Sequence, residues 1–182
     1  MSLQKDRRRI NVKGGGILQV REIDPGSGTF ADIGFIKDSS FIDEYGMVES
    51  VDDKGDYIDT KPGSHKASWK TTLMQTSKEE IDLMTGAVGK YYELYYKAPL
   101  NNSQIQEVVA PVCRIKPGAT LEFKAGTERN IAIEVSFLAP ATALTRTPTA
   151  YNTVAWQPYI MTEGSVANGA PSDAVTVPRA AI

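Results

Sequence analysis

The stretch SHKASWKTTLMQTSKEEIDLMTG, residues 64–86, decides the expected fold because its pattern changes from that of a strand to that of a helix. In its first half, two sets of side chains alternate. One set is His65, Ala67, Trp69, Thr71 and Leu73, and the other is Lys66, Ser68, Lys70 and Thr72. A period of two places the sets on opposite faces of a strand. We therefore predict that Trp69 and Leu73 lie in the core, while the lysines face water or a partner.

The second half of the stretch has the features of a short α-helix over about residues 77–86. Ser77 and Glu80 have the spacing of a capping box, in which the serine caps the first turn and the glutamate returns the hydrogen bond. Ile81 begins an apolar side that we predict to contact the core, and Gly86 suits a left-handed C-cap. A helix this short needs packing against a core to be stable.

The composition fits one globular domain with extensions. The chain has 182 residues, is 41% hydrophobic and carries a formal net charge of −2, so nothing favours nucleic-acid binding by the whole surface. No apolar run reaches the ~18 residues of a membrane span. No apolar stretch follows the charged N-terminus, so we expect neither a membrane span nor a secretory signal.

Strand patterns elsewhere predict a mainly β chain. In NIAIEVSFLAP, residues 130–140, the side chains of Ile133, Val135 and Phe137 share one face and are predicted core residues. Turn signals at residues 54–55 and 62–63 make residues 41–75 a long hairpin or an excursion between paired strands. Further strands are predicted at 17–23, at 29–37 and 41–50 around a polar break at 38–40, and at 88–98, 105–118 and 120–126.

No set of side chains predicts catalysis. His65 is the only histidine, and no nucleophile, metalloprotease or nucleotide-binding motif accompanies it. Cys113 is the only cysteine, and its apolar strand context indicates a buried, inert thiol. The acids around Gly55 do not have the spacing of a calcium loop. We therefore expect no enzyme, no bound metal and no cofactor.

A tyrosine-rich strand leaves two interpretations open. VGKYYELYYKA, residues 88–98, contains Tyr91, Tyr92, Tyr95 and Tyr96. One interpretation is a half-buried strand, and the other is an aromatic platform that binds a sugar.

The two ends differ in composition from the middle of the chain. Residues 1–13 form a basic arm with Arg7, Arg8 and Arg9. Residues 140–182 are rich in Ala, Thr and Pro and have only four charges in 43 residues. The sequence "NTVAWQPYIM" within them could form one strand. We therefore divide the chain into an arm, a β domain at 14–139 and an extension at 140–182.

An excess of acids lies between Asp38 and Asp59, where eight acids accompany a single base, Lys54. A solvated loop would explain it, and so would a surface that must be negative to repel a polyanion. Besides Asp38, the acids are Asp43, Glu44, Glu49, Asp52, Asp53, Asp56 and Asp59.

The order of these elements resembles that of the tail tube proteins of long-tailed bacteriophages. The matching region runs from Thr29 to Leu83, with "ADIGFIKD", an acidic strand pair and then "GSHKASWKTTLMQTSKEEIDLM". The strands after the helix, ending in "IAIEVSFLA", also fit. The long extension at 140–182 departs from the family pattern.

The resemblance implies a β-sandwich or partly closed barrel with one short flanking α-helix and extended arms at both ends. Such subunits form hexameric rings that stack into a tube, a virion structure assembled in the cytoplasm of the bacterial host. The expected partners are other copies, other tail proteins, and DNA that passes through the lumen without specific binding during ejection. The seven acids from Asp43 to Asp59 would line the lumen or the ring joints, and the arginines of the arm would contact the next ring.

Two alternatives remain open. One is another tail or connector ring, such as a tail terminator, which would form a single ring or a different stack. The other is a carbohydrate-binding β-sandwich, which predicts monomers that bind glycans through the tyrosines.

Overall fold

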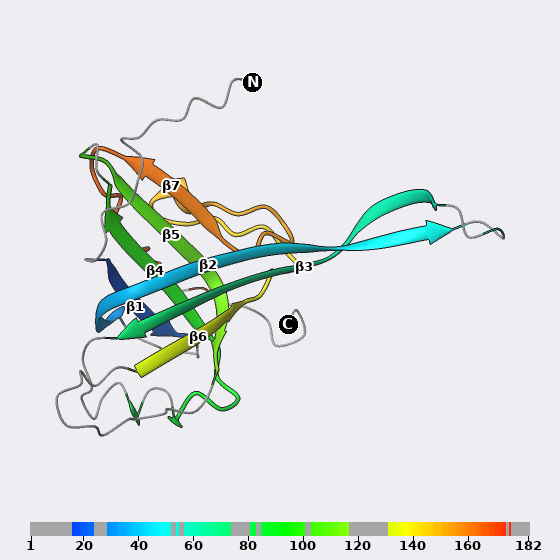
Figure 1. The fold of residues 1–182 in the computed structure, drawn as a ribbon. Coiled ribbons are helices and arrows are strands. Elements are labelled where there is room, and N and C mark those ends of the chain that lie inside the picture. The colour runs from blue at the N-terminus through cyan, green and yellow to red at the C-terminus, as the bar shows by residue number, and fades with distance from the viewer. Residues whose placement is uncertain are drawn as a thin grey trace.

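The computed structural model describes residues 16–23, 29–51, 54, 57–73, 81–82, 85–100, 103–116, 131–173 and 175. The fold is mainly β and sandwich-like, as predicted (Figure 1). The strands are β1 (Ile17–Glu22), β2 (Ala31–Val51), β3 (Tyr57–Leu73), β4 (Tyr92–Pro99), β5 (Ile105–Ile115), β6 (Ile131–Phe137) and β7 (Ile160–Gly164), with a 3-10 turn, η2, at Thr149–Tyr151.

The strands form one antiparallel sheet with the order β4-β1-β2-β3-β6-β5-β7. An additional pairing between β4 and β5 makes the sheet curl around its core. The contact between β5 and β6 involves only the three residue pairs from Cys113 to Ile115, so the sheet is not closed into a regular barrel. Extended strand ends therefore remain at its margins.

The core lies inside the curl because each strand presents an apolar face to it. In β6, the residues at alternate positions from Ile131 to Phe137 are buried, while the residues between them are not. Trp69 lies in this core, with its ring centroid 4.4 Å from that of Tyr96. The other predicted core residues Leu73, Ile133, Val135 and Phe137 are buried in the same cluster, and Ile81 is partly buried against it.

Strand β2 differs from the prediction of two strands separated at 38–40, since it continues through that segment. Asp38, Ser39 and Ser40 pair in register with Thr72, Thr71 and Lys70 of β3. A ladder uses backbone groups, so polar side chains can continue it when they face solvent. Ser39 and Ser40 are indeed exposed.

Only the end of the predicted helix lies within the described residues. Residues 81, 82 and 85 are helical, and the Gly86 N–H donates to the Asp82 carbonyl oxygen at 2.8 Å. The predicted capping residues, Ser77 and Glu80, lie outside the described residues.

The strand predicted within residues 152–161 forms further along the chain, as β7, which pairs with β5. Trp156 has a φ of 65°, a left-handed conformation that cannot belong to a strand, and Pro158 has no N–H for a ladder. Among the described residues, no helix is long and apolar enough to span a membrane.

Candidate assembly surface

The most prominent feature of the chain is the long hairpin of β2 and β3, which projects from the body of the sheet (Figure 1). The two strands pair from Ile36 opposite Leu73 out to Val51 opposite Tyr57. Pairing of β2 with β1 extends only over Ala31–Phe35, and pairing of β3 with β6 only over Ala67–Leu73. We call residues 44–51 and 57–66 the outer hairpin.

Among the described strands, the two strands of the outer hairpin pair only with each other. A two-stranded hairpin is marginally stable alone, and its unpaired edges are templates for pairing with another chain. The outer hairpin therefore has the geometry of an element that is completed by a partner.

Three of the predicted acids, Glu44, Glu49 and Asp59, lie along this hairpin, and Asp43 directly precedes it in β2. Glu44 is exposed, and Glu49 and Asp59 are placed by their backbone pairing with Thr60 and Ser50. The other predicted acids, Asp52, Asp53 and Asp56, and the arm residues Arg7, Arg8 and Arg9, lie outside the described residues. The sequence excess of acid thus belongs at least partly to the outer hairpin and its base.

Lys66 and Lys70 of β3 each lie near an acid of a neighbouring strand. The Lys70 ammonium lies 3.7 Å from Glu134 of β6, and Lys116 also pairs with Glu134 at 3.2 Å. Lys66 lies directly opposite Glu44 in the ladder. Asp43 belongs instead to a separate site.

That site is a hollow of about 380 Å³ at the base of the outer hairpin, which we call the base hollow. The hairpin contributes Asp43, Tyr45 and His65, and residues 154–161, which lead into β7, form the other side. The rings of Tyr45 and His65 stack with centroids 4.1 Å apart. Two segments that are distant in sequence thus form one surface.

Asp43 is the charged centre of the base hollow. Its Oδ2 accepts a 2.6 Å hydrogen bond from the Tyr159 hydroxyl, and its Oδ1 contacts Nε2 of His65. Burial alone would raise the pKa of Asp43, but the bonds from Tyr159 and His65 outweigh it and hold this pKa below its usual range. Burial and the bond to Asp43 raise the pKa of Tyr159 to about 12. The carboxylate is therefore ionised at neutral pH, and the phenol remains its donor.

Exposed apolar side chains gather around this carboxylate. Among the described residues, four of the six exposed large hydrophobic side chains line the base hollow: Tyr45, Val154, Trp156 and Met161. Trp156 is 68% exposed, and its backbone N–H donates to the Pro140 carbonyl at 2.8 Å, which holds the left-handed backbone. A concentration of exposed apolar groups in one place is typical of an interaction site.

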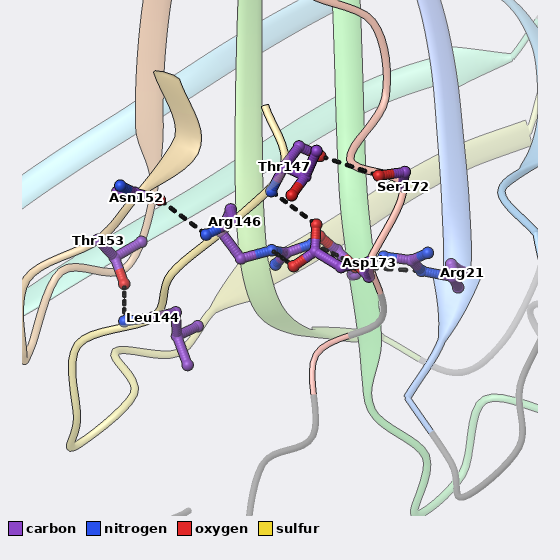
Figure 2. A network of polar contacts seen from close by, with 9 residues as sticks. Arg21, Leu144, Arg146, Thr147, Asn152, Thr153, Ser172 and Asp173 are labelled. Atoms are coloured by element: carbon purple, nitrogen blue, oxygen red, sulfur yellow. Dashed lines mark hydrogen bonds and ion pairs between the residues drawn. The ribbon is translucent and has the colours of Figure 1, made fainter. Parts of the chain in front are cut away.

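A second polar arrangement fixes the segment that forms one wall of the base hollow. We call Arg21, Glu93, Arg146 and Asp173 the buried charge cluster; Figure 2 shows Arg21, Arg146 and Asp173 from close by. Arg146 pairs with one oxygen of Glu93, and Arg21 pairs with the other. Arg146 also donates to the Asp173 carboxylate at 3.0 Å, and Asp173 accepts from the Thr147 N–H at 2.7 Å.

Two arginines face two acids in the buried charge cluster, and only the Asp173 side chain is partly exposed. Glu93 is fully buried, and burial raises its pKa although both arginines oppose the rise. Burial also acts to raise the pKa of Asp173, but the Thr147 N–H and Arg146 outweigh it and lower this pKa. Because Arg21 is in β1 and Glu93 in β4, the cluster attaches residues 146–173 to the sheet.

Glu107 of β5 provides another attachment for the same segment. Its carboxylate accepts hydrogen bonds from the Asn168 and Gly169 N–H groups, at 2.9 and 3.1 Å, and from the Tyr95 hydroxyl. Burial would raise the pKa of Glu107, and these bonds overcome it and lower the pKa. The described part of the extension is thus packed on the sheet at two buried carboxylates and through β7.

Several sequence interpretations can be compared with these positions. Tyr92, Tyr95 and Tyr96 are buried, so the aromatic sugar-binding platform is wrong for them; the predicted strand forms as β4, but it is buried on both faces and not half-buried. Cys113 is a fully buried free thiol whose pKa is raised by burial, as an inert core residue requires. Within the described residues, no group of three His, Cys, Asp or Glu side chains could hold a metal ion.

The sequence interpretation missed the buried charge cluster and the base hollow. Arg146 and Asp173 are two of only four charges in residues 140–182, and that isolation was the available signal. No local pattern indicated that Trp156 would be exposed in the same hollow as Asp43.

No protein-family model and no curated protein sequence matches the chain. Solved structures with a similar strand arrangement include a chain from the tube terminating cap of an anti-feeding prophage, at 10% identity and a TM-score of 0.46, covering 91% of this chain and 100% of that one. Another is from a sheath-tube complex of an extracellular contractile injection system, at 12% identity and a TM-score of 0.45, covering 80% and 87%. A third is from the tail of an empty gene transfer agent particle, at 17% identity and a TM-score of 0.42, covering 65% and 89%. At these values we infer nothing about function from the likeness.

Proposed function

We propose that the chain is a structural subunit of a phage-type tail tube, in which copies form hexameric rings that stack and enclose a passage for DNA. The observation that carries the proposal is the outer hairpin, whose described strands pair only with each other. Side-by-side pairing of such hairpins in a ring satisfies their edges and builds a continuous wall. The tail-tube resemblance of Thr29 to Leu83 covers this same hairpin.

The charge of the hairpin suits a conduit. Its acids, among them Glu44, Glu49 and Asp59, repel phosphate, and a wall with few cationic sites holds a moving strand weakly. The subunit performs no chemistry in this proposal, and it functions in the virion together with other tail proteins. A single terminating ring is the second candidate, because the same hairpins would also close a ring that does not stack.

Electron microscopy of the purified protein in negative stain tests the proposal directly. We expect rings and stacked tubes from the parent chain. Joining Gly46 directly to Gly63 removes residues 47–62 and leaves a Gly-Gly-Ser turn between Tyr45 and His65, which pair in the parent. Three-residue hairpin loops that contain glycine are common.

The shortened chain keeps the core of the sheet, so it should stay folded by circular dichroism but form neither rings nor tubes. Val166→Ser, at an exposed position after β7 and outside the base hollow, is the control and should assemble normally. Normal tubes from the shortened chain would contradict the proposal. Single rings from the parent, without tubes, would favour the terminating ring.

A further inference from the structure

The base hollow combines an ionised carboxylate with exposed aromatic side chains, and this combination attracts a cation. Tyr45 and Trp156 are 58% and 68% exposed, and Asp43 lies with them in the hollow. Aromatic faces attract a cation through the ring quadrupole, and arginine in particular stacks on rings while donating to carboxylates.

The chain already binds its own arginines in this way. The guanidinium carbon of Arg21 lies 4.4 Å from the centroid of the Phe30 ring while its nitrogens bond to Glu93. The guanidinium of Arg114 lies 4.4 Å over the ring of Tyr91. The hollow offers the same two groups, a ring and an anionic oxygen, on an open surface.

We propose that the base hollow binds an arginine side chain from residues 7–9 of a second copy of the chain. These residues are the only run of three arginines in the sequence, and their charge complements Asp43. The hollow adjoins the hairpin through which copies would meet, so this inference rests on the proposed function. It identifies Asp43, among the predicted acids, as the one that receives the arm.

A binding titration tests the inference apart from assembly. The probe is a labelled peptide with residues 1–13, and the receptor is the full-length chain with Arg7→Gln, Arg8→Gln and Arg9→Gln, so that its own arm does not compete. Fluorescence anisotropy at about 50 mM salt measures the affinity, because screening is weaker there. A peptide with citrulline at positions 7–9 has the same shape without the charge.

We expect the arginine peptide to bind at least about tenfold more tightly than the citrulline peptide. In the receptor, Asp43→Asn and Trp156→Ala should each weaken binding by about tenfold, a loss of about 1.4 kcal/mol. Glu163→Gln, an exposed acid of β7 outside the hollow, is the matched control and should not change the affinity. The exposed Trp156 side chain can be truncated without opening the core, so its variant keeps the test decisive if Asp43→Asn misfolds.

Equal binding of the two peptides, or unchanged binding to Trp156→Ala, would overturn the inference. If the parent forms tubes but the arginine peptide does not bind, the inference fails and the proposed function stands. If the peptide binds while the parent forms no rings or tubes, the proposed function fails, and the hollow remains a site for basic segments.

Discussion

Replacing Arg146 by methionine removes one of the two cations that hold the buried carboxylate of Glu93. The Arg146 side chain is 2% exposed, and it donates to Glu93, to the Asp173 carboxylate at 3.0 Å and to the Asp173 carbonyl at 2.9 Å. Methionine is also long and flexible, so it retains much of the packing and removes all three interactions. The substitution therefore isolates the electrostatic role of the buried charge cluster.

We expect the free energy of unfolding to fall by about 3–5 kcal/mol, the usual cost of removing one partner from a buried ion pair. A hydrogen bond to a charged group contributes about 1.5–3 kcal/mol, so the loss of three would cost more if Glu93 had no other partner. Arg21 still donates to Glu93 Oε2 and limits the loss. In a chain of this size the change lowers Tm by about 6–20 °C.

Urea unfolding at pH 7, followed by tryptophan fluorescence and by circular dichroism, measures this loss. Arg114→Met is the matched control, because Arg114 is exposed over Tyr91 and its removal should cost less than about 1 kcal/mol. A loss for Arg146→Met as small as that of the control would refute the reasoning.

A triple variant distinguishes charge from packing at the same site. Arg21→Met, Glu93→Leu and Arg146→Met together remove the three buried charges of the cluster, so the triple variant should be more stable than Arg146→Met alone. The Asp173 side chain, which is 37% exposed, can then be solvated. A triple variant that is less stable than the single one would show that Glu93 without Arg146 is not the main cost.

Three further predictions concern the core, the pH dependence and the arm. Trp69→Ala should lower the free energy of unfolding by about 3–5 kcal/mol in urea titrations. Trp69→Phe should cost less, because phenylalanine keeps a ring in the core and removes a buried indole N–H that has no partner among the described residues. An alanine variant as stable as the parent would contradict the burial of Trp69. The pKa of Glu107 is lowered in the folded chain, so the stability that Glu107 contributes is complete above its unfolded pKa of about 4.5 and is lost as the pH falls through its folded pKa. In a series of urea midpoints measured at decreasing pH, Glu107→Gln should therefore lose less stability in this acidic range than the parent. An unchanged slope would count against this role of Glu107. Deleting residues 1–13 should leave Tm unchanged and shorten any tubes seen by microscopy, whereas tubes of normal length would exclude a role for the arm in stacking.

The inner half of the hairpin could be predicted from the sequence because one of its faces is buried. The alternation around Trp69 and Leu73 reflects a strand that pairs with β6 over the core. The outer hairpin has no such constraint, because its β3 residues pair with β2 but not with β6. For the same reason the polar residues at 38–40 looked like a break: a ladder depends on the partner strand, and the partner is not visible locally.

The polar sites were harder to predict because their members are distant in sequence. Glu93 and Arg146 are 53 residues apart, and Asp43 and Tyr159 are 116 apart. The position of Trp156 depends on a left-handed backbone held by Pro140, which tryptophan does not itself favour. Only the scarcity of charge after residue 140 pointed to Arg146 and Asp173.

The formal net charge of −2 conceals a separation that bears on how copies could meet. The two arginines of the buried charge cluster are matched by Glu93 and Asp173, so the cluster projects little field. The sequence from Asp38 of β2 to Lys66 of β3 holds eight acids and three lysines, so the hairpin segment is negative in every copy. Like-charged hairpins placed side by side repel each other over roughly 10 Å at 0.1 M salt. Backbone pairing must then overcome this repulsion or a basic segment must relieve it, and the arm with Arg7 to Arg9 is the most concentrated positive charge that the chain has for this purpose.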